Sequence, residues 1–332
     1  MRNLKTYHQL FENIQELTPE QVKWLNKCTD GGWKLNSQTG LVDVDGDFVC
    51  SKHDLTDFKG IRFGVVSGDF ICEYNQLISL VGSPQDVGGH FSCSNNQLTT
   101  LEGAPQKVGE SFYCAHNRLT SLVGSPQKIG GHFDCDYNQL TSLGGAPQEI
   151  SRYFSCKHNQ LTSLEGAPQS VGGYFYCQNN RLTSLVGSPQ SVGGDFSCSN
   201  NQLTSLEGAP QKVGGWFNCE DNQLTTLEGA PQEVRGSFFC ENNQLTTLEG
   251  APQKVGGLLN CEDNPVSEET LKSIFFLMEK RKSYLQAVES LWSKIPLEDQ
   301  ALLYRTGFEW VSPEERRKLE AVRAYYGFKG MI

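Results

Sequence analysis

The segment FSCSNNQLTTL at residues 91–101 represents a frame that returns along this chain every 21 residues. The residues that return are those equivalent to Phe91, Cys93, Asn96, Leu98 and Leu101. A fixed period of this length is typical of a solenoid, in which each repeat is one coil that buries its apolar side chains only against neighbouring coils. The cysteines that mark the regular repeats are Cys72, Cys93, Cys114, Cys135, Cys156, Cys177, Cys198, Cys219, Cys240 and Cys261.

Each repeat is expected to contain a short strand that ends near its cysteine. Counted from the cysteine, Phe91 stands at −2 and Cys93 at 0, so both point into the core, and the leucines at +5 and +8 extend that core. The asparagine at +3, Asn96 in this repeat, is expected to turn the chain out of the strand. Its amide can satisfy backbone groups of its own coil and of the adjacent coil, forming a ladder. The frame therefore predicts a long parallel sheet on one face.

The segment that leads to the next strand, residues 101–109 in this repeat, is too rich in glycine and proline for a helix. We expect it to run extended or in turns. Because the back of each coil is thin, neighbouring coils are expected to have nearly the same spacing on both sides. The solenoid should therefore be only gently curved.

Residues 1–45 are predicted to form an N-terminal cap of helices and strands. Thr18-Pro19-Glu20-Gln21 combines an N-cap, a first-turn proline and a capping-box glutamine, which predicts a helix over the residues that follow. An earlier helix is expected at 7–17. Asp30-Gly31-Gly32 is expected to break the chain before a short strand pair, 33–35 with 41–44. Such a cap covers the open edge of the first coil.

Residues 46–266 are predicted to form the solenoid, with about eleven coils centred on Cys50 and on the ten cysteines above. The terminal coils are irregular, since His53 replaces the usual asparagine and Leu259 replaces the usual phenylalanine. Residues 267–332 change to helical periodicity and are predicted to form a small C-terminal helical domain. The fold class is therefore α+β, with a parallel-sheet solenoid between an N-terminal cap and a helical end.

The charge of the chain is concentrated in the solenoid. The net charge is −10 at pH 7, and residues 46–266 carry 22 acidic and 12 basic side chains. A surface of this sign repels phosphate backbones and anionic lipid, so we expect no direct nucleic-acid or membrane binding and a basic protein as partner.

Compartment is inferred from the apolar segments and from cysteine usage. No stretch approaches the length of a transmembrane helix, and residues 1–8 lack the apolar core of a secretory signal. The cysteines recur at one frame position, which predicts buried packing thiols in a reducing compartment. A cytoplasmic location is expected.

Four positions, −3, −1, +1 and +2, vary freely between repeats, and all four are expected on the exposed side of the sheet. Neutral drift is the alternative explanation, but drift favours small polar residues, whereas this face carries large rings, including Tyr153 and Tyr174 on neighbouring coils within stacking reach. Exposed aromatic side chains at this density are typical of protein interfaces. The predicted partner-binding residues are His90, Tyr113, His116, His132, Tyr137, Tyr153, His158, Tyr174, Tyr176, Trp216 and Phe239, with Glu220, Asp221 and Glu241 in an acidic flank.

Catalysis and metal binding are not expected. The sequence Cys219-Glu220-Asp221 matches a motif of effector ubiquitin ligases, but its cysteine belongs to the buried row. His90 and His132 share one column two coils apart, about 10 Å, which is too far for one ion. Glycine pairs recur in each coil without the strand-to-helix context of a phosphate loop. We expect no enzyme activity, no metal and no cofactor.

The frame resembles the leucine-rich repeat, whose L-x-L-x-x-N-x-L core corresponds here to Phe-x-Cys-x-x-Asn-x-Leu. It is most similar to the short, proline-containing repeats of secreted bacterial effectors and to leucine-rich-repeat proteins of tailed bacteriophages. One departure is the apolar residue before the phenylalanine, which lies four positions earlier (Val87 to Phe91) instead of three. The resemblance implies a leucine-rich-repeat solenoid that binds other molecules. For a phage protein it implies sequestration of a host protein, such as an immunity component, in the host cytoplasm.

The sequence thus predicts a non-catalytic protein-binding module. Two alternatives stay open. A structural or virion-associated spacer would have an inert sheet face. An acidic mimic of nucleic acid, blocking a DNA-binding enzyme, would bind in a way that collapses with salt. No pattern in the sequence specifies the partner or the oligomeric state.

Overall fold

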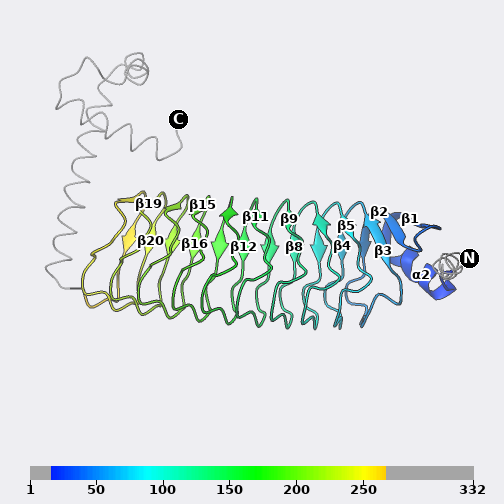
Figure 1. The fold of residues 1–332 in the computed structure, drawn as a ribbon, viewed down its shortest axis with the longest axis horizontal. Helices are drawn as coiled ribbons and strands as arrows, with labels where there is room; N and C mark the ends of the chain where they lie inside the picture. Colours follow the sequence, from blue (N-terminus) through cyan, green and yellow to red (C-terminus); the bar gives the residue numbers. More distant parts are fainter. Residues whose placement is uncertain (1–15, 267–332) are drawn as a thin grey trace, which may run out of the picture. The chain divides into compact units, whose positions relative to one another are not determined.

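The structure is a computed structural model that describes residues 16–266 (Figure 1). Within this range the chain coils repeatedly into a solenoid with two parallel strand ladders. The helix expected at 7–17 lies almost wholly outside the described residues, and the helical domain expected at 267–332 lies wholly outside them. In the described part, no helix is long and apolar enough to cross a membrane.

Helix α2 (Pro19–Cys28) forms the first part of the cap, as predicted. The Thr18 side chain accepts a hydrogen bond from the Gln21 amide N–H, and the Gln21 side chain accepts one from the Thr18 amide N–H, so the capping box is confirmed. Trp24, Leu25 and Cys28 are buried on one side of the helix. The Trp24 ring meets the ring of Phe48 edge-on at 5.3 Å. The helix therefore contacts the first ring of the solenoid core.

Strands β1 (Thr29–Leu35) and β2 (Val42–Val49) pair antiparallel, and they confirm and extend the expected strand pair. The expectation that Asp30-Gly31-Gly32 breaks the chain was wrong, because these residues lie inside β1. Gly31 faces Gly46 across the pair, and both have positive φ. A Cβ on Gly31 would collide with the carbonyl oxygen of Asp45, so the glycines allow two backbones to approach closely within the ladder.

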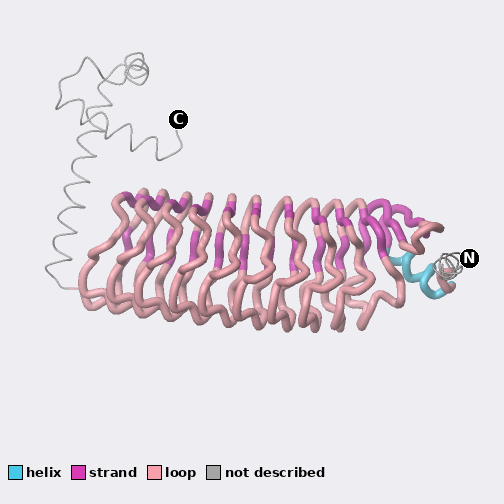
Figure 2. Tube along the Cα trace, in the orientation of Figure 1, coloured by secondary structure: helices cyan, strands magenta, loops and turns pink. Residues whose placement is uncertain are grey.

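The first ladder continues from the C-terminal end of β2, where Phe48 pairs with Phe70. Figure 2 shows the short strands, in magenta, that recur from coil to coil. Its strands are two residues long and join in parallel, each to the equivalent strand of the next coil. They are β4 (Phe70–Ile71), β6 (Phe91–Ser92), β8 (Phe112–Tyr113), β10 (Phe133–Asp134), β12 (Phe154–Ser155), β14 (Phe175–Tyr176), β16 (Phe196–Ser197), β18 (Phe217–Asn218), β20 (Phe238–Phe239) and β22 (Leu259–Asn260).

A second parallel ladder runs through the segment that leads to each of these strands, and it starts from β2 as well. The segment is extended, as expected, but the prediction of a single ladder was incomplete. Its backbone groups pair with the same residues of neighbouring coils, which satisfies them without a helix. Its strands are β3 (Phe63–Val66), β5 (Asp86–Val87), β7 (Lys107–Val108), β9 (Lys128–Ile129), β11 (Glu149–Ile150), β13 (Ser170–Val171), β15 (Ser191–Val192), β17 (Lys212–Val213), β19 (Glu233–Val234) and β21 (Lys254–Val255).

The core is a row of stacked phenylalanine rings. The Phe154 ring lies 5.5 Å from that of Phe133 and 5.3 Å from that of Phe175, nearly parallel to both. The inward cysteine and the leucines at +5 and +8 are also fully buried in the central coils, for example Cys156 and Leu161. The inward positions predicted from the frame are confirmed.

The cysteines act as packing thiols, as predicted. They are free thiols, and those of the regular coils from Cys72 to Cys240 are fully buried. Each of these thiols donates to a carbonyl oxygen of the next coil, for example Cys72 Sγ to Ser92 O at 3.2 Å. Burial raises the pKa of Cys72 well above its ordinary value, so the thiol stays protonated and unreactive.

The asparagine ladder is confirmed as well. Asn96 Nδ2 donates to Cys93 O and, one coil back, to Cys72 O, both at 3.0 Å. Asn96 Oδ1 accepts from the Leu77 amide N–H at 2.9 Å. Each asparagine therefore joins two coils where the backbone leaves the strand.

Candidate protein-binding face

The side chains at −3, −1, +1 and +2 of successive coils border the outer side of the first ladder, and we call this surface the variable face. Contacts connect its columns. The His90 ring at −3 lies 6.0 Å from that of Tyr113 at −1, and Ser155 Oγ at −1 donates to Asp136 Oδ1 at +1 at 2.6 Å. The residues selected from the sequence thus include members of two columns, −3 and −1, that touch one another, whereas Ser155 and Asp136 were not selected.

Position −3 is less free than the sequence suggested, because most of its side chains accept a hydrogen bond from the next coil. Asp69 Oδ1 accepts from the His90 N–H at 2.6 Å, His90 Nδ1 from the Ser111 N–H at 3.2 Å, and Ser111 Oγ from the His132 N–H at 3.0 Å. His132 Nδ1 accepts from the Tyr153 N–H in the same way, at 3.3 Å. The presence of aspartate, serine and histidine at −3 is therefore explained by their role as hydrogen-bond acceptors between coils.

Position +2 is constrained by the backbone. In the ten regular coils its φ lies between 51° and 58°, the left-handed region in which asparagine, aspartate and histidine are over-represented. His116, His158 and Asp221 are three such residues. The structure thus accounts for several polar side chains that the sequence analysis attributed to recognition. Tyr137, at the same position, is not a residue that this backbone favours.

Stacked rings cover the first half of the variable face. The Tyr137 ring lies between those of His116 and His158, at 4.3 Å and 4.1 Å and nearly parallel to both. The His132 ring stacks on that of Tyr153 at 4.0 Å. The +2 column therefore forms a stack of three rings in which a tyrosine separates the two histidines, whereas the −3 column contributes the stacked pair His132 and Tyr153.

A looser set of rings continues on the second half. The Tyr176 ring lies 5.8 Å from Tyr174 and 6.2 Å from Trp216, and Trp216 meets Phe239 at 6.4 Å. The neighbouring coils do not stack Tyr153 on Tyr174 as expected, since Tyr153 stacks on the preceding coil. Tyr174 lies over Gly194 of the following coil, where a Cβ would collide with its ring. The missing side chain of Gly194 makes this room.

Three rings at −3 stand where the column otherwise supplies an acceptor: Tyr153, Tyr174 and Trp216. Their hydroxyl and indole groups do not take the place of the aspartate, serine or histidine acceptor in the described hydrogen bonds between coils. Tyr174 is 45% exposed, whereas the others are partly buried against neighbouring rings. The acceptor role of this column therefore does not account for these three rings.

Two carboxylates, Asp134 at −1 and Asp136 at +1, lie among the rings, and the sequence analysis did not select them. Asp136 is well satisfied: Oδ1 accepts from the Lys157 amide N–H at 2.7 Å, and Oδ2 pairs with Lys157 Nζ at 3.0 Å. Asp134 Oδ1 accepts from the Asp136 N–H at 3.0 Å. Desolvation, and then the negative charge of Asp136, raise the pKa of Asp134 to about 6. One signal was available in the sequence, because Asp134 is the only carboxylate at −1 in the repeats.

The raised pKa of Asp134 predicts a pH-dependent gain in stability for Asp134→Asn. A carboxyl group whose pKa is higher in the folded state stabilises the fold while it is protonated, and this contribution is lost as pH rises from about 4 through about 6. Removing the charge is expected to raise the free energy of unfolding by about 1–2 kcal/mol at about pH 7.5, because the group is partly exposed. Urea unfolding followed by circular dichroism measures the difference. At about pH 3.5 the gain should vanish; a gain of equal size at both pH values would contradict this assignment.

The acidic flank lies along position +1 at the end of the array. Glu220 and Glu241 occupy this position in successive coils, so their charges repel. Desolvation, followed by the charges of Glu220 and Glu262, raises the pKa of Glu241, although its own backbone and the Asn260 amide oppose the rise. Asn260 donates to one Glu241 oxygen, and the other oxygen, Oε2, is buried without a hydrogen-bond partner.

The groups considered for catalysis and metal binding have other roles here. Cys219 is fully buried, Sγ donates to Phe239 O at 3.3 Å, and burial raises its pKa well above the ordinary value, so it lacks thiolate character. Across residues 16–266, no three His, Cys, Asp or Glu side chains are placed to share a metal ion.

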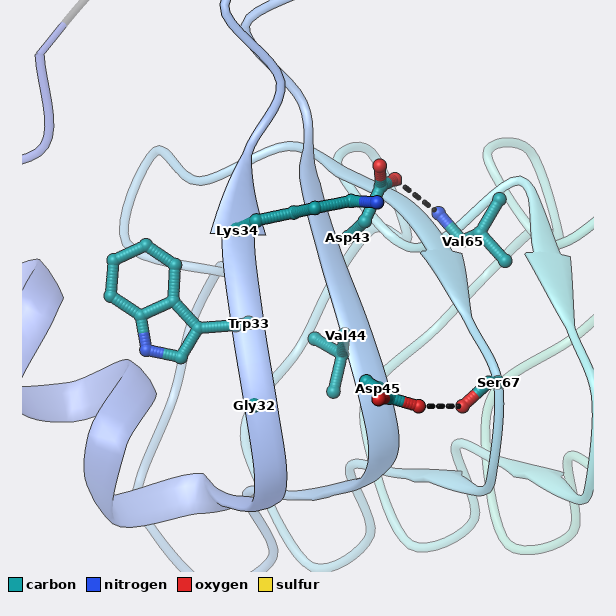
Figure 3. A pocket seen from close by; sticks show the side chains of 8 residues that line it. All are labelled: Gly32, Trp33, Lys34, Asp43, Val44, Asp45, Val65 and Ser67. Atoms are coloured by element: carbon teal, nitrogen blue, oxygen red, sulfur yellow. Dashed lines mark hydrogen bonds between the residues drawn. The ribbon is translucent and has the colours of Figure 1, made fainter.

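A hollow of about 530 Å³ lies on the cap, between β1, β2 and β3 (Figure 3). Its carboxylates serve the backbone and neighbouring side chains: Asp43 Oδ1 accepts from the Val65 N–H at 3.0 Å, and Asp45 Oδ1 accepts from Ser67 Oγ at 3.3 Å. The Trp33 side chain points away from these carboxylates, and its Nε1 donates to Asn26 Oδ1 at 2.7 Å. These bonds give the hollow's polar residues a structural role.

Comparison with solved structures finds six chains that are similar to this one. No model of a known protein family matches the chain, and no curated protein does. YopM from Yersinia enterocolitica WA-314 is 16% identical, with 78% of this chain and 73% of that chain covered, and a TM-score of 0.36. The solenoid is established by the 21-residue repeat and by the parallel strand pairing themselves. The resemblance to phage proteins stays a prediction.

Proposed function

We propose that this chain is a non-catalytic protein-binding module that acts by occupying a partner's surface with its variable face. The observation that carries the proposal is the placement of Tyr153, Tyr174 and Trp216 at −3. At this position the fold uses side-chain acceptors, so large rings give up inter-coil hydrogen bonds. Tyrosine and tryptophan are also the side chains that dominate protein-binding hot spots. Leucine-rich-repeat solenoids are typical protein-interaction modules, which supports the same conclusion.

The narrower form of the proposal is that the partner is a protein of a bacterial host, such as an immunity component, and that binding sequesters it in the host cytoplasm. The support is the sequence resemblance to phage-encoded leucine-rich-repeat proteins. The negative charge of residues 46–266 favours a basic partner.

The triple variant Tyr153→Ser, Tyr174→Ser and Trp216→Ser tests the proposal. Serine supplies the acceptor that the column uses elsewhere, as Ser111 and Ser237 do, so the variant is expected to fold. In pull-downs from bacterial lysate, read by mass spectrometry, the native chain is expected to retain a protein at about 0.5 M salt that the variant loses by tenfold or more.

The matched control replaces three exposed apolar residues outside the variable face, Val81, Val123 and Val186, with serine. This control should retain the same protein, and circular dichroism should show native content in both variants. Equal capture by the native chain and the ring variant would contradict the proposal. It would favour the alternative function, a structural spacer with an inert sheet face. A partner retained at about 0.1 M salt and lost at about 0.5 M salt would instead favour the acidic mimic of nucleic acid.

A further inference from the structure

Asp134 occupies an unusual place at the centre of the variable face. On the first ladder it pairs in register with Tyr113 of the preceding coil and with Ser155 of the following coil. Equivalent residues of adjacent parallel strands lie about 4.8 Å apart, so Asp134 and Tyr113 are neighbours along the −1 column. Other coils have serine, tyrosine, asparagine or an apolar residue at this position.

A second tyrosine, Tyr153, belongs to the coil that follows Asp134. Burial raises the pKa of the Tyr153 hydroxyl above its ordinary value, and the next largest contributions come from Asp134 and then Tyr113. His132 lies two residues before Asp134 on the same side of the first ladder, so a ring stacked on His132 lies on the same stretch of the variable face as the carboxylate. The His132 ring, stacked on Tyr153 at 4.0 Å, holds that ring in place. Asp134 is therefore flanked by a tyrosine of the preceding coil, Tyr113, and by a tyrosine of the following coil, Tyr153.

The charge of Asp134 is only partly compensated within the chain, because the cation that acts on it is shared with Asp136. The nearby cation is Lys157, but its Nζ lies 3.0 Å from Asp136 Oδ2 and sits over the Tyr176 ring at 5.7 Å. The hydrogen bond that Asp134 receives comes from the neutral Asp136 N–H. A partly buried carboxylate with a second carboxylate behind it gains from an external cation.

Among protein cations, the guanidinium group fits these surroundings best. It is planar, it stacks on tyrosine rings, and it can give two parallel hydrogen bonds to one carboxylate. We propose that an arginine side chain of a protein partner docks at Asp134, with its guanidinium between Tyr113 and Tyr153. This inference rests on the proposed function and names the chemistry that the first half of the variable face recognises.

Fluorine NMR of the full chain labelled with 3-fluorotyrosine tests the inference directly. The probe is a blocked peptide of three Arg-Gly repeats, and Tyr113→Phe and Tyr153→Phe variants assign the two resonances. The peptide is expected to shift both resonances, whereas a Lys-Gly peptide of equal charge should bind about threefold more weakly and a Gln-Gly peptide should not bind. Equal binding of the Arg and Lys peptides would overturn guanidinium recognition.

The variant Asp134→Asn is expected to weaken the Arg-Gly peptide about tenfold, since it removes the ionic hydrogen bonds. It relieves a partly buried charge, so it should fold. Asp221→Asn, which removes an equal charge from an exposed position of the same face, should change binding about twofold or less. Equal losses in the two variants, or an unchanged affinity in Asp134→Asn, would refute the arginine site.

The two proposals fail separately. If lysate capture is lost in the triple ring variant but unchanged in Asp134→Asn, the protein-binding function holds and the arginine site does not. If the Arg-Gly peptide binds at Asp134 while the ring variant still captures the same proteins as the native chain, the site binds arginine but the proposed interface is wrong.

Discussion

Asn138→Ala is expected to lower the free energy of unfolding by about 4 kcal/mol, because the side chain satisfies four buried backbone groups at once. Nδ2 donates to Cys114 O and Cys135 O, both at 3.1 Å, and to Asp136 O at 3.2 Å. Oδ1 accepts from the Leu119 N–H at 2.9 Å. Alanine leaves these groups without partners in a position that water reaches poorly. Urea unfolding followed by circular dichroism at about pH 7.5 measures the loss.

Gln139→Ala is the matched control. Gln139 is the next residue, its side chain is exposed, and its backbone N–H bonds to Leu119 O whatever its side chain. Its expected effect is about 0.5 kcal/mol or less. A loss below about 1 kcal/mol for Asn138→Ala would show that water replaces the side chain, and it would refute a stabilising asparagine ladder.

Phe154→Ala is expected to lower the free energy of unfolding by about 3–5 kcal/mol, the range for large buried aromatic residues. Its ring is fully buried and has a parallel neighbour on each side, Phe133 and Phe175. Since each coil is stabilised only by its neighbours, the loss should weaken the array at its middle. Hydrogen–deuterium exchange read by mass spectrometry is expected to show faster exchange in the coils on both sides of Phe154 than in the terminal coils.

Cys156→Ala tests whether the effect comes from the ring. The thiol is fully buried in the same coil, but alanine removes one sulfur atom and one weak hydrogen bond, to Tyr176 O at 3.5 Å. The expected loss is about 1 kcal/mol. Comparable losses for Cys156→Ala and Phe154→Ala would argue against the ring stack as the main source of cohesion.

The regular part of the fold could be predicted from the sequence because one frame is repeated many times. Inward positions such as Phe91 and Leu98, the asparagine ladder and the capping box follow from local rules, and all are confirmed. The second ladder was missed, because strands such as β7, which lie between a proline and a glycine, are too short to show alternation. The full length of β1 was missed because glycine is usually a breaker, whereas Gly31 is needed for close backbone approach.

The variable face was harder to predict, because exposure and freedom to vary are different properties. The repeats differ at −3 and +2, but Asp69 and Ser111 serve as acceptors and His116 adopts a left-handed backbone. These roles depend on the adjacent coil or on φ, neither of which a column of residue types displays. The roles found for −3 and +2 leave several rings unexplained, including Tyr153 and Tyr137, and their part in recognition stays a prediction.

The acceptor column at −3 has a consequence for how such a gene can change. Its bonds join one frame position to the same position in the next coil, so gaining or losing a whole 21-residue unit leaves both ladders in register. The array can therefore lengthen or shorten by unequal crossing-over without redesign of its core. The joints after His90 and His132 are exceptions, since Glu110 and Arg152 replace the usual glycine there, and His90 Nε2 lies 2.9 Å from Glu110 Oε2. Inserting a unit at the first of these joints would separate His90 from its partner Glu110.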